Sequence, residues 1–161
     1  MKLLIVRPFS HELSGNVVTC ERLVSIFDSL GHETRTLGCD DPTSLQVCNS
    51  WADTLVAVHA SKSGAVIDGA RSNLPVVVVF GGTDVNHDAH ESAAAAASFS
   101  RRVARASRCV AFSESILAAA PAGALPPARC AVISQSAWIP GAAPDEAGDG
   151  RPPVGGAEEP D

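Results

Sequence analysis

The feature that most constrains the fold is the apolar run at residues 76–80, which leads directly into the turn Gly81-Gly82-Thr83-Asp84. Four consecutive valines and a phenylalanine are typical of a parallel strand that is covered on both faces. In open α/β sheets, ligands bind where such strands end. The two glycines permit a positive φ or a close approach to a ligand. The segment therefore predicts a buried strand that opens into a polar site.

Strand and helix patterns alternate along the rest of the chain. Strands are predicted at residues 2–6, 34–37, 54–58, 76–80, 110–112 and 131–134, and helices at 16–30, 42–51, 63–71, 88–107 and 114–120. Gly31 is expected just after the end of the first helix, and Asp88 with Glu91 is expected to cap the long one. This alternation predicts an α/β fold, a Rossmann-like doubly wound parallel sheet, with residues 34–37 near its edge.

Length and charge divide the chain into a body and a tail. The 161 residues suffice for one α/β domain but not for two. Most of the net charge of −6 lies in residues 140–161, which are rich in acidic residues, proline and glycine. We expect a folded domain at residues 1–139 and a disordered tail at 140–161. The nearly neutral body argues against nucleic-acid binding.

Cysteine usage and hydropathy indicate a cytoplasmic location. The five cysteines are an odd number without a C-x-x-C pair, which argues against a disulfide framework or a structural zinc site. A reducing compartment fits this pattern. The apolar start of the chain stops at Arg7-Pro8, short of a signal peptide, and no run is long enough to span a membrane.

The first strand-to-helix loop, residues 7–16, lies where mononucleotide-binding folds hold phosphate. Gly15 and Asn16 begin the helix, and free N–H groups at a helix N-terminus attract anions. The loop has no G-x-G-x-x-G and no Walker A lysine, so neither NAD nor a P-loop nucleotide is indicated, and we expect no cofactor. A loop in which Gly15 serves only the turn remains the alternative.

His59 follows the strand at residues 54–58 directly, and Ser61 and Lys62 come next. A polar residue at the carboxyl end of a strand lies in the ligand crevice of such a sheet. Imidazole is suited to proton transfer and to binding sugar hydroxyls. A purely structural histidine is the alternative at this position.

A second histidine group superficially resembles a metal site. His87 and His90 are three residues apart at the start of a predicted helix, close to Asp84 and Asp88. A metal needs at least three suitably spaced ligands. No third ligand has a defined spacing, and capping explains Asp88. We therefore expect no metal site.

Charged residues near the later helices have simple structural explanations. Arg101, Arg105 and Arg108 are predicted to form a solvated helix face, with an anion-binding or domain-contact surface as the alternative. Ser113 is a natural N-cap for the helix at residues 114–120, and Glu114 suits its first turn. The chain has no G-x-S-x-G elbow of a serine hydrolase.

Five short motifs, taken in order, resemble the glycosyltransferase 1 domain-containing proteins. These are nucleotide-sugar-dependent, retaining glycosyltransferases of the family-4 type. The motifs are residues 7–8 with 15–16, residues 57–59, residues 80–86, residues 111–115 and residues 132–136. The bacterial selenosugar synthases, another branch, are similar around residues 59–62 and 135–136. The resemblance covers residues 2–136.

The resemblance implies the N-terminal, acceptor-side half of a GT-B enzyme, in which two Rossmann-like domains enclose a cleft. Its substrates would be a nucleotide-sugar and an unknown acceptor, with no required metal. Gly15 and Asn16 would approach the donor, while His59 and the turn after the fourth strand would line the transfer site. The implied catalytic residues are His59 and Asp84, and the implied substrate-binding residues are Gly15, Asn16, Lys62, Gly82, Thr83 and Glu114.

Members of that family continue past the strand at residues 132–136 into a second domain that binds most of the donor. This chain instead continues with Trp138-Ile139-Pro140 and the acidic tail. We expect a truncated form with little transferase activity of its own, since donor electrostatics usually supply the largest catalytic term. The alternative is a non-catalytic Rossmann-like module that binds a small ligand or a protein. The interdomain face left open, with Ala137, Trp138 and Ile139, predicts self-association.

Overall fold

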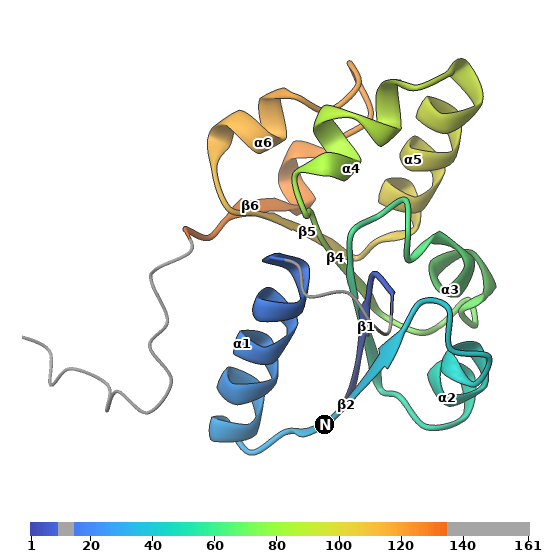
Figure 1. Ribbon diagram of the computed structural model, residues 1–161, viewed down its shortest axis with the longest axis vertical. Helices are drawn as coiled ribbons and strands as arrows, with labels where there is room; N and C mark the ends of the chain where they lie inside the picture. Colours follow the sequence, from blue (N-terminus) through green and yellow to red (C-terminus); the bar gives the residue numbers. More distant parts are fainter. Residues whose placement is uncertain (10–14, 135–161) are drawn as a thin grey trace, which may run out of the picture.

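The computed structural model describes residues 1–9 and 15–134. The tail at residues 140–161 and the apolar residues 137–139 lie outside this described part. Six parallel strands form one sheet in the order β2-β1-β3-β4-β5-β6 (Figure 1). The strands are β1 (Lys2–Arg7), β2 (Glu33–Gly38), β3 (Thr54–Val58), β4 (Val76–Val79), β5 (Arg108–Ala111) and β6 (Cys130–Val132). The predicted α/β parallel sheet is confirmed, with β2 at its edge.

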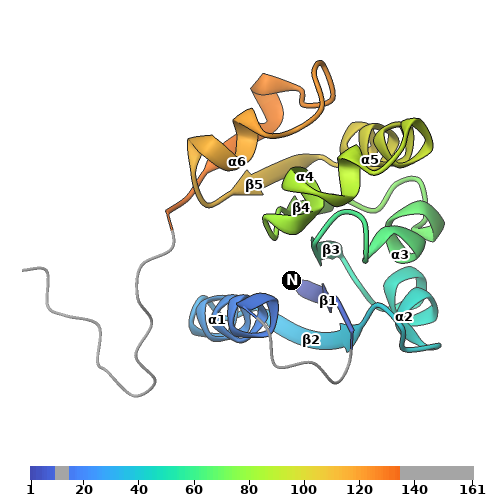
Figure 2. The same ribbon diagram turned by 45° about the horizontal axis from the view of Figure 1, so that its top comes forward.

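Helices connect the strands and cover both faces of the sheet. They are α1 (Gly15–Ser29), α2 (Ser44–Ser50), α3 (Gly64–Gly69), α4 (Thr83–Asn86), α5 (Ala93–Arg105) and α6 (Glu114–Ala118), with short 3₁₀ turns η1 (Asp88–His90) and η2 (Pro127–Arg129). Helix α1 lies on one face, and α2, α3 and α5 lie on the other (Figures 1 and 2). Within the described part of the chain, no helix has both the length and the apolar character needed to cross a membrane.

The order of the strands fixes where a ligand site is expected. From β1 the chain moves outward to β2, and then returns past β1 to add β3, β4, β5 and β6 in turn. The direction of winding therefore reverses between β1 and β3. In doubly wound sheets the crevice at the carboxyl ends of such strands is the usual ligand site.

Alternating side chains of the central strands divide the core into two layers. Leu4 and Val6 of β1 belong to the larger cluster, which packs against α3 and α5 through residues such as Ile67 and Phe99. Ile5, between them, belongs to the smaller cluster beneath α1. Both clusters are buried, which explains why the strands are almost continuously apolar rather than alternating.

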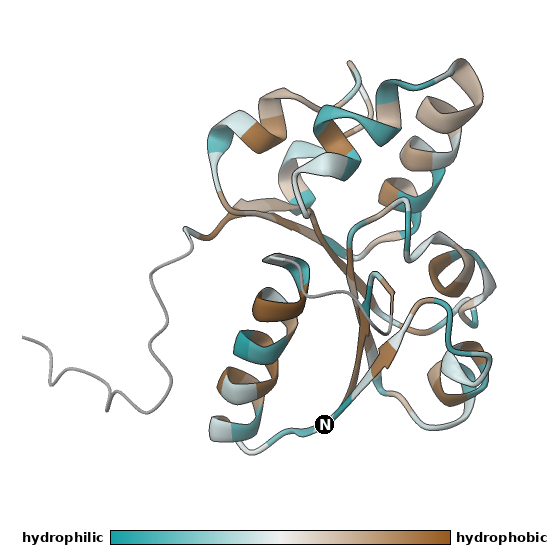
Figure 3. Cartoon of the chain, in the orientation of Figure 1, coloured by the Kyte–Doolittle hydropathy of each residue, from teal (hydrophilic) through white to brown (hydrophobic). Residues whose placement is uncertain are grey.

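The layer beneath α1 is only partly covered by the described residues. Helix α1 packs on β1 and β2, and an apolar groove of about 300 Å³ remains beside it. Figure 3 shows the hydrophobic character of the central strands that form its floor. The groove is lined by Leu23, Ile26, Phe27, Val56, Val77, Val79, Val110, Phe112 and Ile133.

The single helix predicted at residues 88–107 is wrong, because the segment is divided into η1 and α5. Helix α5 begins after Ser92, whose Oγ accepts a hydrogen bond from the N–H of Ala95 at 3.1 Å. Asp88 and Glu91 have the spacing of a capping box, but they precede the true start of α5. Asp88 instead turns toward His59, with 3.6 Å between its Oδ2 and the imidazole Nε2.

The predicted solvated face of Arg101, Arg105 and Arg108 is only partly correct, because Arg101 and Arg108 are exposed but the three residues do not share one helix face. Helix α5 ends at Arg105, and Arg108 is the first residue of β5. The Arg105 guanidinium donates to the carbonyl oxygens of Arg71 at 2.8 Å and Leu74 at 3.0 Å. It therefore ties the loop before β4 to the end of α5, a tertiary role that helical spacing does not reveal.

Candidate functional site

The two glycines of the turn after β4 serve different purposes, a positive φ at Gly82 and a close approach of neighbouring side chains at Gly81. Gly82 has φ 95° and ψ −54°, a left-handed conformation that favours glycine. At Gly81 an added Cβ would lie 2.8 Å from Asn16 Oδ1 and 3.2 Å from His59 Cδ2. The close approach expected at this turn is therefore made to the start of α1 and to the end of β3.

Asp84 fastens this turn to the end of β3. Its side chain is fully buried. Oδ1 accepts hydrogen bonds from the N–H groups of Gly81 and Gly82 at 3.0 Å each and of Val85 at 3.1 Å. Oδ2 accepts from the N–H of Ala60 at 2.9 Å. Burial raises the pKa of the Asp84 carboxyl, while the nearby imidazole and these N–H donors oppose that rise.

His59 is buried beside this carboxylate and is held at both ring nitrogens. Nδ1 accepts the backbone N–H of Lys62 at 3.3 Å, and Nε2 lies 2.9 Å from Thr83 Oγ1. Burial lowers the pKa of His59, and the attraction of Asp84 and Asp88 only partly opposes this effect. In the neutral ring, Nε2 therefore carries the proton and donates to the Thr83 hydroxyl.

The backbone of His59 is itself in the left-handed region, with φ 71°. Such a conformation costs about 1–3 kcal/mol in a residue other than glycine and persists only where its surroundings enforce it. The His59 N–H donates to the carbonyl of Val79 at 2.8 Å, and its carbonyl accepts from the Ser63 N–H at 3.0 Å. The chain therefore turns sharply where β3 ends, which brings Ser61 and Lys62 to the carboxyl edge of the sheet.

A polar hollow of about 380 Å³ lies at this edge, close to the reversal between β1 and β3. Of the described residues that line it, Lys62 alone carries a charge. The hollow brings together four of the predicted substrate-binding residues. The lining consists of Gly15, Asn16, Thr19, Lys62, Gly81, Thr83 and Phe112.

The surroundings of the hollow favour an anion. Helix α1 has 15 residues, begins at Gly15 and has no acidic side chain in its first turn, so the positive end of its dipole is not neutralised there. The Lys62 ammonium lies 4.8 Å from the centre of the Phe9 ring, a cation–π contact that helps to hold it in place. Backbone dipole and ammonium charge thus act on the same hollow.

The other predicted site residues lie apart from this lining. His59 and Asp84 are buried behind it, and Gly82 shapes its wall through the backbone. Glu114 begins α6 after Ser113, whose Oγ accepts from the N–H of Ile116 at 3.4 Å as the predicted N-cap. Glu114 is exposed and does not line the hollow.

Two lining residues were not anticipated from the sequence. Thr19 lies one helical turn after Gly15, and its Oγ1 donates to the Gly15 carbonyl at 2.9 Å, so helical spacing could have placed it there. Phe112 directly follows β5, and the carboxyl end of that strand lies at the same edge of the sheet.

A larger hollow of about 470 Å³, lined by Arg7, Cys20 and Thr36 among others, lies under α1.

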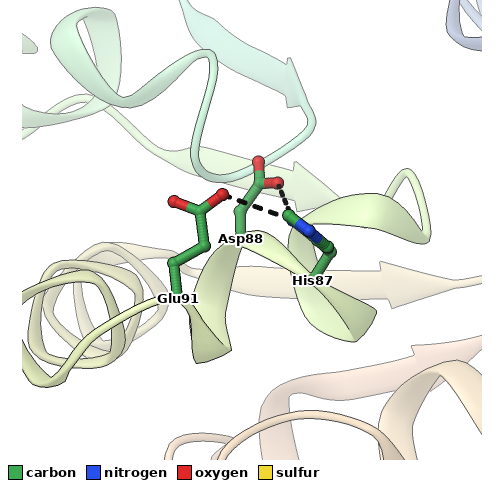
Figure 4. Close-up of side chains that lie close together, drawn as sticks. All are labelled: His87, Asp88 and Glu91. Atoms are coloured by element: carbon green, nitrogen blue, oxygen red, sulfur yellow. Dashed lines mark ion pairs between the residues drawn. The ribbon is translucent and has the colours of Figure 1, made fainter.

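A second polar cluster follows the same turn and consists of His87, Asp88 and Glu91 (Figure 4). The side chains of His87 and Glu91 are 73% and 58% exposed, against 22% for Asp88. His90, the partner suggested by spacing, lies elsewhere, because its Nε2 is 2.8 Å from the carbonyl oxygen of Ala119. Two carboxylates therefore accompany His87 in place of a second imidazole.

No known family model matches this chain. The resemblance carried by the short motifs remains a prediction.

Proposed function

We propose that this protein is the acceptor-side half of a nucleotide-sugar-dependent glycosyltransferase, and that its polar hollow holds the phosphate or sugar part of the donor. The supporting observation is that the start of α1, Asn16 and Lys62 converge on one hollow. A helix N-terminus and a lysine ammonium both attract phosphate. An amide both donates and accepts hydrogen bonds, as recognition of sugar hydroxyls requires.

The size of the hollow limits which part of a donor it accepts. Its volume of about 380 Å³ lies near the lower end of the range for small-molecule sites, about 300–1,000 Å³. A phosphate with one sugar ring suits this volume better than a whole nucleotide-sugar does. The nucleotide would then extend beyond the described lining residues.

His59 and Asp84, the catalytic residues suggested by the resemblance, are assigned positioning roles in this proposal. Neither has exposed surface, so neither touches a ligand in this conformation. Thr83 is exposed, and its hydroxyl oxygen accepts a hydrogen bond from the Nε2–H group of His59. The Thr83 O–H is then free to donate to a ligand oxygen, so the buried imidazole orients an exposed donor.

Binding of UDP-glucose and GDP-mannose to the 161-residue chain, measured by calorimetry, tests the proposal. Asn16→Ala and Lys62→Met are each expected to weaken binding about tenfold, because each removes one polar contact worth about 1.4 kcal/mol. Lys2→Met is the matched control. Lys2 is the only other lysine of the chain, and its ammonium lies 5.9 Å from the centre of the Trp51 ring.

The expected result is binding that weakens in Asn16→Ala and Lys62→Met but persists in Lys2→Met. UDP alone and inorganic phosphate serve as comparison ligands, and the sugar-bearing ligands should bind more tightly than either. Absence of binding by a chain that circular dichroism shows to be folded would overturn the proposal. Equal weakening by both lysine substitutions would overturn it as well.

The second candidate is a non-catalytic module that binds a small phosphorylated ligand. It is favoured by the absence of any carboxylate or imidazole among the described residues that line the hollow, so no acid or base is in place there. Ligand preference separates the two candidates, since little turnover is expected of this chain in either case. Tighter binding of the nucleotide-sugars than of inorganic phosphate supports the glycosyltransferase half, whereas an affinity that inorganic phosphate matches would identify the module.

A further inference from the structure

The cluster after α4 has the dimensions of a metal site (Figure 4). His87 Nδ1 lies 3.3 Å from Glu91 Oε1 and 3.5 Å from Asp88 Oδ1, and the three candidate ligand atoms lie within 4.8 Å of one another. Nitrogen and oxygen ligands bind zinc at about 2.0–2.2 Å. Tetrahedral geometry then separates neighbouring ligands by about 3.3–3.6 Å. Two of the three spacings already match.

We propose that His87, Asp88 and Glu91 bind a divalent transition-metal ion of the Zn²⁺ or Mn²⁺ class. One imidazole with two carboxylates suits these ions, whereas Mg²⁺ and Ca²⁺ favour all-oxygen sites. Three protein ligands leave at least one coordination position open, as in catalytic zinc sites. The site is separate from the polar hollow and does not depend on glycosyltransfer.

The backbone that carries the three ligands is fixed by local hydrogen bonds. The N–H of His87 donates to the carbonyl of Thr83 at 2.9 Å, and the N–H of His90 donates to the carbonyl of His87 at 2.9 Å. The N–H of Glu91 donates to the carbonyl of Asp88 at 3.4 Å. Only side-chain rotations are therefore needed to adjust the ligands to an ion.

Asp88 also lies between the cluster and the buried imidazole behind the polar hollow. Its Oδ1 faces His87, while its other oxygen, Oδ2, lies 3.6 Å from Nε2 of the buried His59. This distance is too long for a hydrogen bond, and the Nε2 proton is already directed to Thr83. Neither oxygen of Asp88 is therefore committed to a hydrogen bond with His59, and Oδ1 faces the other candidate ligands.

The position of the cluster also indicates what could fill the open coordination position. Asp88 and Glu91 line a hollow of about 280 Å³ whose wall includes the cationic side chains of Lys62 and Arg102. An anionic oxygen, such as one of a phosphate, would there meet the metal ion and both cations. Lys62 lines this hollow and the polar hollow alike, so the two sites adjoin.

Cobalt and zinc chlorides are the probes that test the site on the full 161-residue chain after removal of metals. Tetrahedral Co²⁺ absorbs in the visible, while thiolate ligation adds a near-ultraviolet charge-transfer band. This distinction matters because the described residues include five free cysteines. Wild-type protein is expected to take up one equivalent of Co²⁺ without the thiolate band, and Zn²⁺ should displace it.

The decisive variants are His87→Gln and Glu91→Gln, each expected to weaken binding at least about tenfold. His90→Gln is the matched control, because His90 is a neighbouring exposed histidine outside the cluster. Unchanged circular dichroism would show that these surface substitutions leave the fold intact. Equal binding by His87→Gln and wild type, a thiolate band, or no uptake of either ion would overturn the proposal and leave a plain ion pair of His87 with its acidic neighbours.

Discussion

The turn after β4 separates two groups of the same chemistry that differ in burial. His59 and Asp84 on one side are fully buried, and the carboxylate is surrounded by backbone N–H donors. His87 and Glu91 on the other side are largely exposed, and their polar atoms face each other at 3.3 Å. The buried group has no capacity left for a ligand and serves the fold, whereas the exposed group costs the fold little and retains its capacity to bind.

The largest expected effect is that of Asp84→Ala on stability. Removing this carboxylate leaves four backbone N–H donors without their acceptor in a buried site. The free energy of unfolding should fall by about 3–5 kcal/mol, because each buried donor left without an acceptor costs about 1–3 kcal/mol and solvent can satisfy some of the four. Urea denaturation measures the change. Asp53→Ala, which removes an exposed carboxylate, is the control, and a loss below about 1 kcal/mol in Asp84→Ala would remove the distinction between the two groups.

A smaller loss is expected for Gly82→Ala, which tests the turn itself. An added Cβ meets no atom within 4 Å at this position, but the residue keeps φ at 95°. The cost is therefore one of backbone strain, about 1–2 kcal/mol. Denaturant titration of this variant beside Gly15→Ala, where space is also open and no positive φ is required, isolates the strain. Equal stabilities would show that the turn relaxes freely.

The buried imidazole should make stability depend on pH. Because burial lowers the pKa of His59 in the folded state, the unfolded chain binds more protons as pH falls below the ordinary value of about 6.5. Stability at this site is therefore present above that pH and declines on acidification, at no more than about 1.4 kcal/mol per pH unit. The pH dependence of unfolding of wild type should be steeper than that of His59→Gln between pH 7 and 5. Identical slopes would contradict a neutral buried ring.

The smallest effect is predicted for His87→Gln in metal-free protein. Its side chain is 73% exposed, and exposed ion pairs contribute about 0–1 kcal/mol. Thermal unfolding should shift by no more than about 0.5 kcal/mol in free energy. A loss comparable to that of Asp84→Ala would mean that the exposed cluster is also part of the structural framework.

Much of the fold could be predicted from local patterns. All six strands were placed within about two residues at each end, since apolar runs in a parallel sheet are continuous and bounded by turns. The local pattern does not reveal the division at Ser92, because Asp88 with Glu91 has the spacing of a helix cap and the contact with His59 is a tertiary one. The helix Asn16–Leu30 was predicted almost correctly for the same local reasons, with Gly31 at φ 77° after its end.

The sequence predicts where the polar residues of the candidate site gather, but not which of them are buried and which are exposed. The rule that ligands bind at strand ends predicts polar residues at this edge of the sheet, and Asn16, Lys62 and Thr83 line one hollow there. Burial was not predictable, because His59 and Asp84 look as accessible in the sequence as His87 does. Whether a polar side chain faces backbone N–H groups or solvent depends on neighbouring loops that lie far apart in the chain.

The apolar groove beside α1 has a practical consequence for folding experiments. Dyes such as ANS fluoresce on apolar surface, and their fluorescence is commonly used to recognise molten globules. Ile26 and Ile133, which line the groove, are 46% and 58% exposed in the native fold. The native protein is therefore expected to bind the dye, and near-ultraviolet circular dichroism is the signal that separates folded from partly folded chains.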